Sequence, residues 1–132
     1  MTLEHLTPHG LFKPAVFTQV VVATGRRLVF ISGQVSMDAD GNTVAEGDLA
    51  GQARQVYANL KAALDGAGAK PSDVAKLTTY VVAYRPELLP VMGAARTAVL
   101  GTTDLPASTL VGVQALAQPA YLIEVEAIAV ID

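Results

Sequence analysis

Two stretches of the chain carry apolar residues at the three- and four-residue spacing of an amphipathic helix. The first runs from about Leu49 to Asp65, and its apolar stripe consists of Leu49, Ala53, Val56, Leu60 and Leu64. The second runs from Pro86 to about Leu100, and its stripe consists of Leu88, Leu89, Met92, Ala95 and Val99. Asp48 is suited to cap the start of the first helix, and Gly66 and Gly101 are suited to end the two helices. The pattern therefore predicts two helices, each with one buried face.

Runs rich in β-branched and aromatic residues predict five strands. They are residues 17–23, 28–35, 75–83, 108–113 and 121–131. The tetrad Thr24–Arg27 separates the first two runs, and its glycine favours a turn, so we expect these runs to pair as a β-hairpin. Residues 1–14 hold both histidines and two of the seven prolines, and we expect an irregular N-terminal segment there. The predicted order is β-β-α-β-α-β-β.

This order predicts an α+β fold in which two helices pack on one face of a mixed β-sheet. Val20–Val22 and Ala127–Ile131 do not alternate cleanly between apolar and polar residues. Strands that are apolar on both faces need cover on both faces. Because two helices can cover only one face, we expect the other face to meet a second subunit.

Composition supports a protein that associates with itself. The 132 residues allow one domain, residues 1–132, and 52% of them are hydrophobic while only 16% are charged, against roughly 25% in typical domains. A small domain of this kind should keep apolar surface after folding. No apolar run reaches the roughly 20 residues of a membrane-spanning helix. The net charge of −3, without a cluster of Lys and Arg, opposes nucleic-acid binding.

The chain also offers few groups for metal or redox chemistry. Cysteine is absent, which excludes disulfides, Cys-based zinc sites and thiol nucleophiles. His5 and His9 have the spacing of metal ligands on a helix, but Pro8 and Gly10 oppose a helix there, and we expect no bound metal. The first residues lack a basic stretch followed by an apolar one, which is the pattern of a secretory signal, so we expect a cytoplasmic protein.

Glu124 and Glu126 are predicted to share one face of the last strand, because side chains alternate along a strand. A carboxylate in a partly desolvated cleft can position water or transfer a proton. Both residues can also be solvent-facing charges, and the pattern alone favours that interpretation. Ser32 has no adjacent His or Lys that would activate it as a nucleophile, so we interpret it as a ligand-binding residue. Gly33 is typical of a bulge or of a close approach of the backbone.

Three segments, in order along the chain, carry a resemblance to a known family. They are Ile31–Gln34 (ISGQ), Pro106–Val113 (PASTLVGV) and Leu122–Ala129 (LIEVEAIA). Together with the predicted order of elements, they resemble the RidA family, also called the YjgF/YER057c/UK114 family. The resemblance implies a chorismate-mutase-like (bacillus-type) fold and a homotrimer with a barrel-like centre. It further implies small-molecule clefts between subunits, in which members hydrolyse reactive enamines and imines, such as 2-aminoacrylate, to ketoacids and ammonia without a cofactor.

The family's site residues can be compared with this chain position by position. Ser32 and Glu124 match, and the resemblance implies that Glu124 is the catalytic residue and that Ser32 binds substrate. Phe17 stands where the family has Tyr, and Ser108 stands where it has the Arg that grips the substrate carboxylate. Two neighbours complete the predicted substrate-binding set, which is Ser32, Gly33, Ser108, Phe17 and Thr109.

Ser108 changes the substrate that we expect, because a hydroxyl replaces a fixed positive charge. We predict an enamine or imine other than 2-aminoacrylate, with a neutral or differently charged ligand preferred. Four other arginines leave open whether a charge reaches the cleft, and these are Arg26, Arg27, Arg85 and Arg96. Two functional hypotheses follow: an enamine/imine deaminase, or a non-catalytic trimer that binds a small metabolite. Ribonuclease activity is opposed by the missing basic patch.

Overall fold

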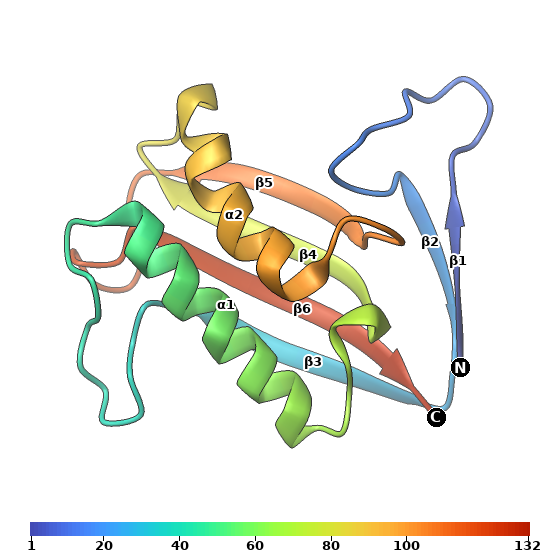
Figure 1. The fold of residues 1–132 in the computed structure, drawn as a ribbon, viewed down its shortest axis with the longest axis horizontal. Helices are drawn as coiled ribbons and strands as arrows, with labels where there is room; N and C mark the ends of the chain where they lie inside the picture. Colours follow the sequence, from blue (N-terminus) through green and yellow to red (C-terminus); the bar gives the residue numbers. More distant parts are fainter.

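The computed structural model describes residues 1–132 and contains a four-stranded sheet, a separate two-stranded sheet and two α-helices (Figure 1). The strands are β1 (Thr2–Leu6), β2 (Val20–Thr24), β3 (Arg27–Gln34), β4 (Val74–Val82), β5 (Ala107–Val113) and β6 (Ile123–Ile131). The helices are α1 (Leu49–Gly66) and α2 (Leu89–Leu100), and short 3-10 turns occupy Pro71–Asp73 and Pro86–Leu88.

The four-stranded sheet has the order β3-β6-β4-β5, and both helices lie on one of its faces (Figure 1). β6 runs antiparallel to its neighbours β3 and β4, whereas β4 and β5 are parallel. The sheet is therefore mixed, and the predicted α+β arrangement with two helices on one face is confirmed. Neither helix combines the length and the apolar character needed to cross a membrane.

Both predicted helices are present. α1 begins at Leu49, with Asp48 in the N-cap position, although the Asp48 side chain makes no capping hydrogen bond. The second helix starts as a 3-10 turn at Pro86 and ends at Gly101, whose φ of 74° is readily adopted by glycine. Its predicted buried stripe is only partly correct. Met92 and Ala95 are buried, but Leu89 is 39% exposed and lines a cavity.

The predicted hairpin between the second and third strands is wrong. β2 pairs with β1, from Thr2 opposite Thr24 to Leu6 opposite Val20, and β3 pairs with β6. The chain changes direction at Gly25, where any Cβ would lie 2.6 Å from Val130 Cγ1. Arg26 N then donates to Ile131 O at 3.1 Å, which joins the start of β3 to the end of β6. The N-terminal segment is accordingly not irregular throughout, because Thr2–Leu6 is a strand.

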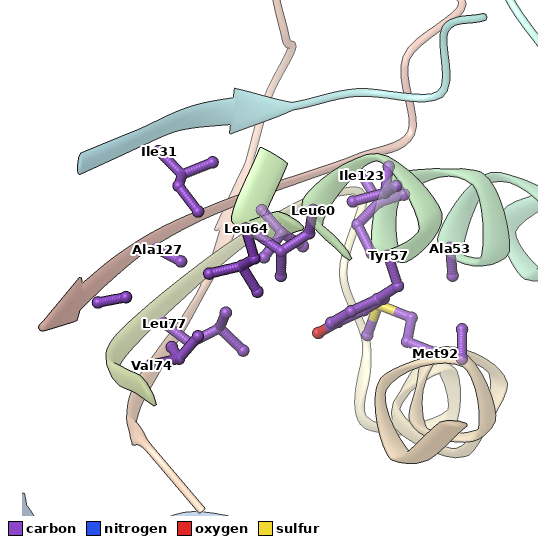
Figure 2. Packing of buried hydrophobic residues seen from close by; sticks show 14 of the residues in the cluster. Ile31, Ala53, Tyr57, Leu60, Leu64, Val74, Leu77, Met92, Ile123 and Ala127 are labelled. Carbon is purple, nitrogen blue, oxygen red and sulfur yellow. The ribbon is translucent and has the colours of Figure 1, made fainter. Parts of the chain in front are cut away.

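The core lies between the helices and one face of the sheet (Figure 2). Alternate residues of β6 point into it, and Ile123, Val125, Ala127 and Ala129 are all buried. From α1, the fully buried Leu60 and Leu64 pack over these strands. The regular burial pattern of β6 places Glu124 and Glu126 on the opposite, open face of the sheet.

The open face is apolar along β3 and polar along the central strands. Leu28 and Phe30 are 61% and 70% exposed. The prediction of an apolar second face is confirmed for Ala127–Ile131, because Ile128 lies opposite Phe30 and both line a hollow on the open face. It is wrong for Val20–Val22, which lie in the separate β1–β2 sheet. Nearer the start of β6, the glutamates lie beside polar residues of β4.

A buried glutamine fixes the segment that leads into β6. The Gln52 side chain, on α1, is fully buried. Its amide donates to Ala120 O at 2.8 Å, and its carbonyl oxygen accepts from Leu122 N at 2.9 Å. Because both contacts satisfy polar backbone groups next to the core, Gln52 sets the position at which β6 begins.

We expect Leu60→Ala to lower the free energy of unfolding by about 2–5 kcal/mol, because it leaves a cavity at a fully buried position. The neighbouring variant Lys61→Ala is the control. It removes an exposed ion pair to Asp65 and should cost about 1 kcal/mol or less. Urea unfolding at one protein concentration measures both. Equal losses in the two variants would contradict the assigned core.

Candidate functional site

A cavity of about 340 Å³ opens on the helix-covered side of the molecule, between α2, β5 and the segment before β2. Ser108 and Phe17, two of the predicted binding residues, both line it. Their proximity has a local cause, because Thr18 N donates to Pro106 O at 3.1 Å and so fastens the segment carrying Phe17 beside the start of β5. Most of the remaining wall is apolar, with Leu89 and Met92 contributed by α2.

The polar groups of this cavity are Tyr57, Thr79, Tyr84, Arg96 and Ser108. Burial raises the pKa of Tyr57 to about 12, while the positive charge of Arg96 and a hydrogen bond with Thr79 act in the opposite direction. Tyr57 is therefore a neutral hydroxyl at physiological pH. Neither Asp, Glu nor His lines the cavity. It offers a cation and several hydrogen-bonding groups but no side chain suited to accept a proton at neutral pH.

The other predicted residues gather on the open face. The pairing of β3 with β6 shifts register between Ile31 and Gln34, which places Ser32 and Gly33 in a bulge. A Cβ added to Gly33 would collide with the carboxylate of Glu124, so the missing side chain lets that carboxylate lie against the β3 backbone. The predicted bulge and close approach at Gly33 are both confirmed.

A second, smaller hollow of about 290 Å³ lies next to this bulge. Ser32, Lys76, Thr78 and Glu126 supply its polar lining. Tyr80 Oη, on the same face of the sheet, donates to Glu126 Oε1 at 2.7 Å. This hydrogen bond, partial desolvation and the charges of the two nearby glutamates raise the pKa of Tyr80. The open face thus carries several polar side chains, of which Tyr80 and Glu126 are joined by this hydrogen bond.

Within one chain, the predicted site residues divide into two groups. Ser108 and Phe17 share the cavity, whereas Ser32, Gly33 and Glu124 lie together on the open face. Thr109 belongs to the second group, because its hydroxyl accepts from Lys76 Nζ at 2.6 Å. The sheet itself separates the two groups. A site that used all six residues would therefore need a second copy of the chain.

Sequence reasoning did not assign several polar residues to either group. Tyr57, Thr79 and Arg96 line the cavity, and Tyr80 contacts Glu126. One signal was available for Arg96, because it follows the buried Met92 by four residues and therefore shares its side of α2. Of the four arginines left open, Arg96 alone lines the cavity. No three His, Asp or Glu side chains are grouped so that they could hold a metal ion.

Comparison with known proteins gives a consistent family match. The model of the family described as "Endoribonuclease L-PSP" matches residues 12–131. A 2-iminobutanoate/2-iminopropanoate deaminase from Dermatophagoides farinae is 32% identical over 79% of this chain and 78% of its own. A deaminase of the same name from Salmonella typhimurium is 43% identical over 54 residues, 41% of each chain.

Solved structures agree with this match. A protein of unknown function of the Rid family from Yersinia pestis is 40% identical with a TM-score of 0.91, covering 98% of this chain and 99% of that one. A member of the YjgF/YER057c/UK114 family from Mycobacterium tuberculosis is 27% identical with a TM-score of 0.64, covering 98% and 99%.

The buried hydroxyl in the cavity predicts an alkaline loss of stability. Between about pH 10 and about pH 12, Tyr57 is deprotonated in the unfolded chain but still protonated in the folded one. The free energy of unfolding should therefore fall as the pH rises through this range, by about 1.4 kcal/mol per pH unit from this group. We expect Tyr57→Phe to remove that part of the slope in urea unfolding. Equal slopes in wild type and variant would contradict the assigned environment of Tyr57.

Proposed function

Because the chain belongs to the Rid family, whose model matches residues 12–131, we propose that it hydrolyses an enamine or imine metabolite to a carbonyl compound and ammonia. The observation that carries the proposal is the Glu124 carboxylate held against Gly33 of the Ser-Gly-Gln segment. This contact couples two of the three segments that resemble the family. A carboxylate beside a binding pocket can transfer protons to and from water and a nitrogen leaving group.

The proposed reaction needs only water as co-reactant. Water attacks the carbon of the protonated imine (C=NH2+) while Glu124 accepts a proton from the water, which gives a neutral carbinolamine. Glu124 returns that proton to the nitrogen, and the C–N bond breaks as the C=O bond forms. The hydroxyl proton passes to Glu124 and then to solvent. Ammonia leaves and the carbonyl product remains. Ser32 and the cavity residues bind and orient the substrate and undergo no covalent change.

The proposed assembly is a homotrimer of chorismate-mutase-like subunits with a barrel-like centre and clefts between subunits. Two observations support it. Leu28 and Phe30 expose apolar area on the open face, where a second chain would cover it. The two groups of site residues also lie on opposite faces of one sheet, so Glu124 of one chain would complete the cavity of its neighbour. The proposed partners are therefore other copies of this chain and a small-molecule ligand, in the cytoplasm.

The proposed substrate differs from 2-aminoacrylate. Ser108 places a neutral hydroxyl in the cavity at the position where the family motif has Arg. Six of the twelve residues that line the cavity have purely apolar side chains, and the rings of Tyr57 and Tyr84 add to this surface. A substrate with an apolar body would use that surface, whereas 2-aminoacrylate has only a methylene group to place there.

A second candidate is a non-catalytic trimer that binds a small metabolite. The observation that favours it is the chemistry of the cavity wall, which holds neither a carboxylate nor a histidine. Tyr57, its most buried hydroxyl, keeps its proton up to about pH 12. Catalysis would therefore depend entirely on Glu124 from outside the cavity, and binding would not.

We expect the wild-type protein to accelerate ammonia release from imines with bulky apolar side chains, generated in situ by an amino-acid oxidase. Glu124→Gln should lower kcat by about 100-fold or more, because it removes the proton-transferring group. Gly33→Ala should also lower kcat, because its methyl group displaces the Glu124 carboxylate. Glu87→Gln, at a site 74% exposed, is the control and should leave kcat unchanged. Full activity of Glu124→Gln would exclude the proposed mechanism.

We expect light scattering to give three times the chain mass of 13.7 kDa. Phe30→Asp should shift the mass towards the single chain, because it places a charge at the most exposed apolar position of the open face. A wild-type mass of 13.7 kDa would overturn the proposed trimer.

A further inference from the structure

We propose that Arg96 makes the cavity a binding site for carboxylates with a bulky apolar body, so that the substrate is the imine of a branched or aromatic 2-oxo acid. The imine substrate rests on the proposed function, whereas carboxylate binding at Arg96 does not. The folded chain leaves the charge of Arg96 without a partner.

Arg96 is half-buried on α2 and forms neither a salt bridge nor a hydrogen bond within the chain. Arg85 differs, since it is 65% exposed and lies 4.0 Å from the Glu87 carboxylate. Arg27 also has a partner, because its Nε donates to Asp132 O at 2.8 Å. A partly desolvated guanidinium without an anion is unfavourable, and an anionic ligand would relieve that cost.

The cavity wall contains nothing that could neutralise this charge. All twelve lining residues are neutral except Arg96 itself. A guanidinium presents five N–H donors in a planar fork, the geometry that binds both oxygens of a carboxylate. Ser108 and Tyr57 add hydroxyls, and the Tyr57 hydroxyl stays protonated because its pKa is about 12. The polar end of the cavity therefore consists of one cation and neutral hydroxyls.

The rest of the cavity determines the other end of the ligand. Phe17, Leu89, Met92, Leu110 and Ile123 supply apolar walls. The volume of about 340 Å³ lies in the range of roughly 300–1,000 Å³ that is usual for small-molecule sites. A carboxylate bound at Arg96 would place a branched or aromatic side chain against these walls. Pyruvate and 2-aminoacrylate would leave most of them uncovered.

This geometry accounts for the position of Ser108. An arginine at position 108 would extend into the cavity from strand β5. In this chain the cation of the cavity is Arg96, which extends from helix α2. The short serine side chain leaves the space in front of β5 open for the ligand. Carboxylate recognition would thus be kept, with the cation moved to another wall and the pocket enlarged.

Isothermal titration calorimetry tests the site by measuring how 2-oxo acids, the products of the proposed hydrolysis, bind to the protein. This measurement does not require catalysis. The probes are 4-methyl-2-oxopentanoate, its uncharged counterpart 4-methylpentan-2-one, and pyruvate. We expect wild type to bind 4-methyl-2-oxopentanoate about tenfold or more tightly than either of the others, since a charge-assisted contact and the apolar wall each contribute to affinity. Comparable affinity for all three, or no binding of any, would overturn the proposal.

The variants are Arg96→Gln, Arg96→Lys and the control Arg54→Gln. Arg54 is an exposed arginine on α1 that forms no ion pair. Arg96→Gln should weaken 4-methyl-2-oxopentanoate binding about tenfold or more and leave 4-methylpentan-2-one unchanged. Arg96→Lys should keep part of the preference for the anion, and Arg54→Gln all of it. Unchanged anion binding in both Arg96 variants would show that the carboxylate binds elsewhere.

Imine hydrolysis by the same proteins separates this proposal from the proposed function. If wild type binds 4-methyl-2-oxopentanoate through Arg96 but hydrolyses no imine, the deaminase proposal fails and the binding site stands. If wild type hydrolyses imines and Arg96→Gln leaves KM for carboxylate-bearing imines unchanged, the deaminase stands and the role of Arg96 is refuted. A rise in KM only for carboxylate-bearing imines supports both.

Discussion

The burial of one face of β6 beneath the two helices is the constraint on which the rest of this structure depends. β6 lies inside the four-stranded sheet, between β3 and β4, so its alternate side chains have to face opposite environments. Ile123 and Val125 enter the core, and Glu124 and Glu126 are thereby directed to the uncovered face. Gln52 reinforces this register by holding the backbone just before the strand.

The division of polar chemistry between two faces follows from that constraint. On the helix-covered side, α2 and the sheet leave a cavity that Arg96 lines. The Glu124 carboxylate lies on the other side of the sheet, against Gly33. Side chains cannot meet through a packed sheet. If binding and proton transfer belong to one reaction, as proposed, they require a neighbouring chain, and exposed apolar side chains on β3 offer a surface on which it would pack.

The sequence predicted those features that depend on local patterns. The helical stripes of Leu49–Gly66 and Leu89–Leu100, and the strands β4 to β6, were recognisable from periodicity and residue type. The hairpin failed because strand pairing is decided by distant residues, and β3 finds its partner about a hundred positions along the chain. Arg96 could be placed on a helix face, but the cavity in front of it depends on the packing of Phe17 and β5, which no local pattern reveals.

Subunit complementation tests the proposed shared site most directly. On that proposal, Glu124→Gln lacks proton transfer. A chain with its cavity filled by Ser108→Trp lacks binding, so each variant alone should be inactive. Trimers reassembled from a mixture should regain imine hydrolysis, because some clefts combine an intact cavity with an intact Glu124 from the neighbouring chain. Mixed trimers with no more activity than the two separate variants would contradict a site built from two subunits.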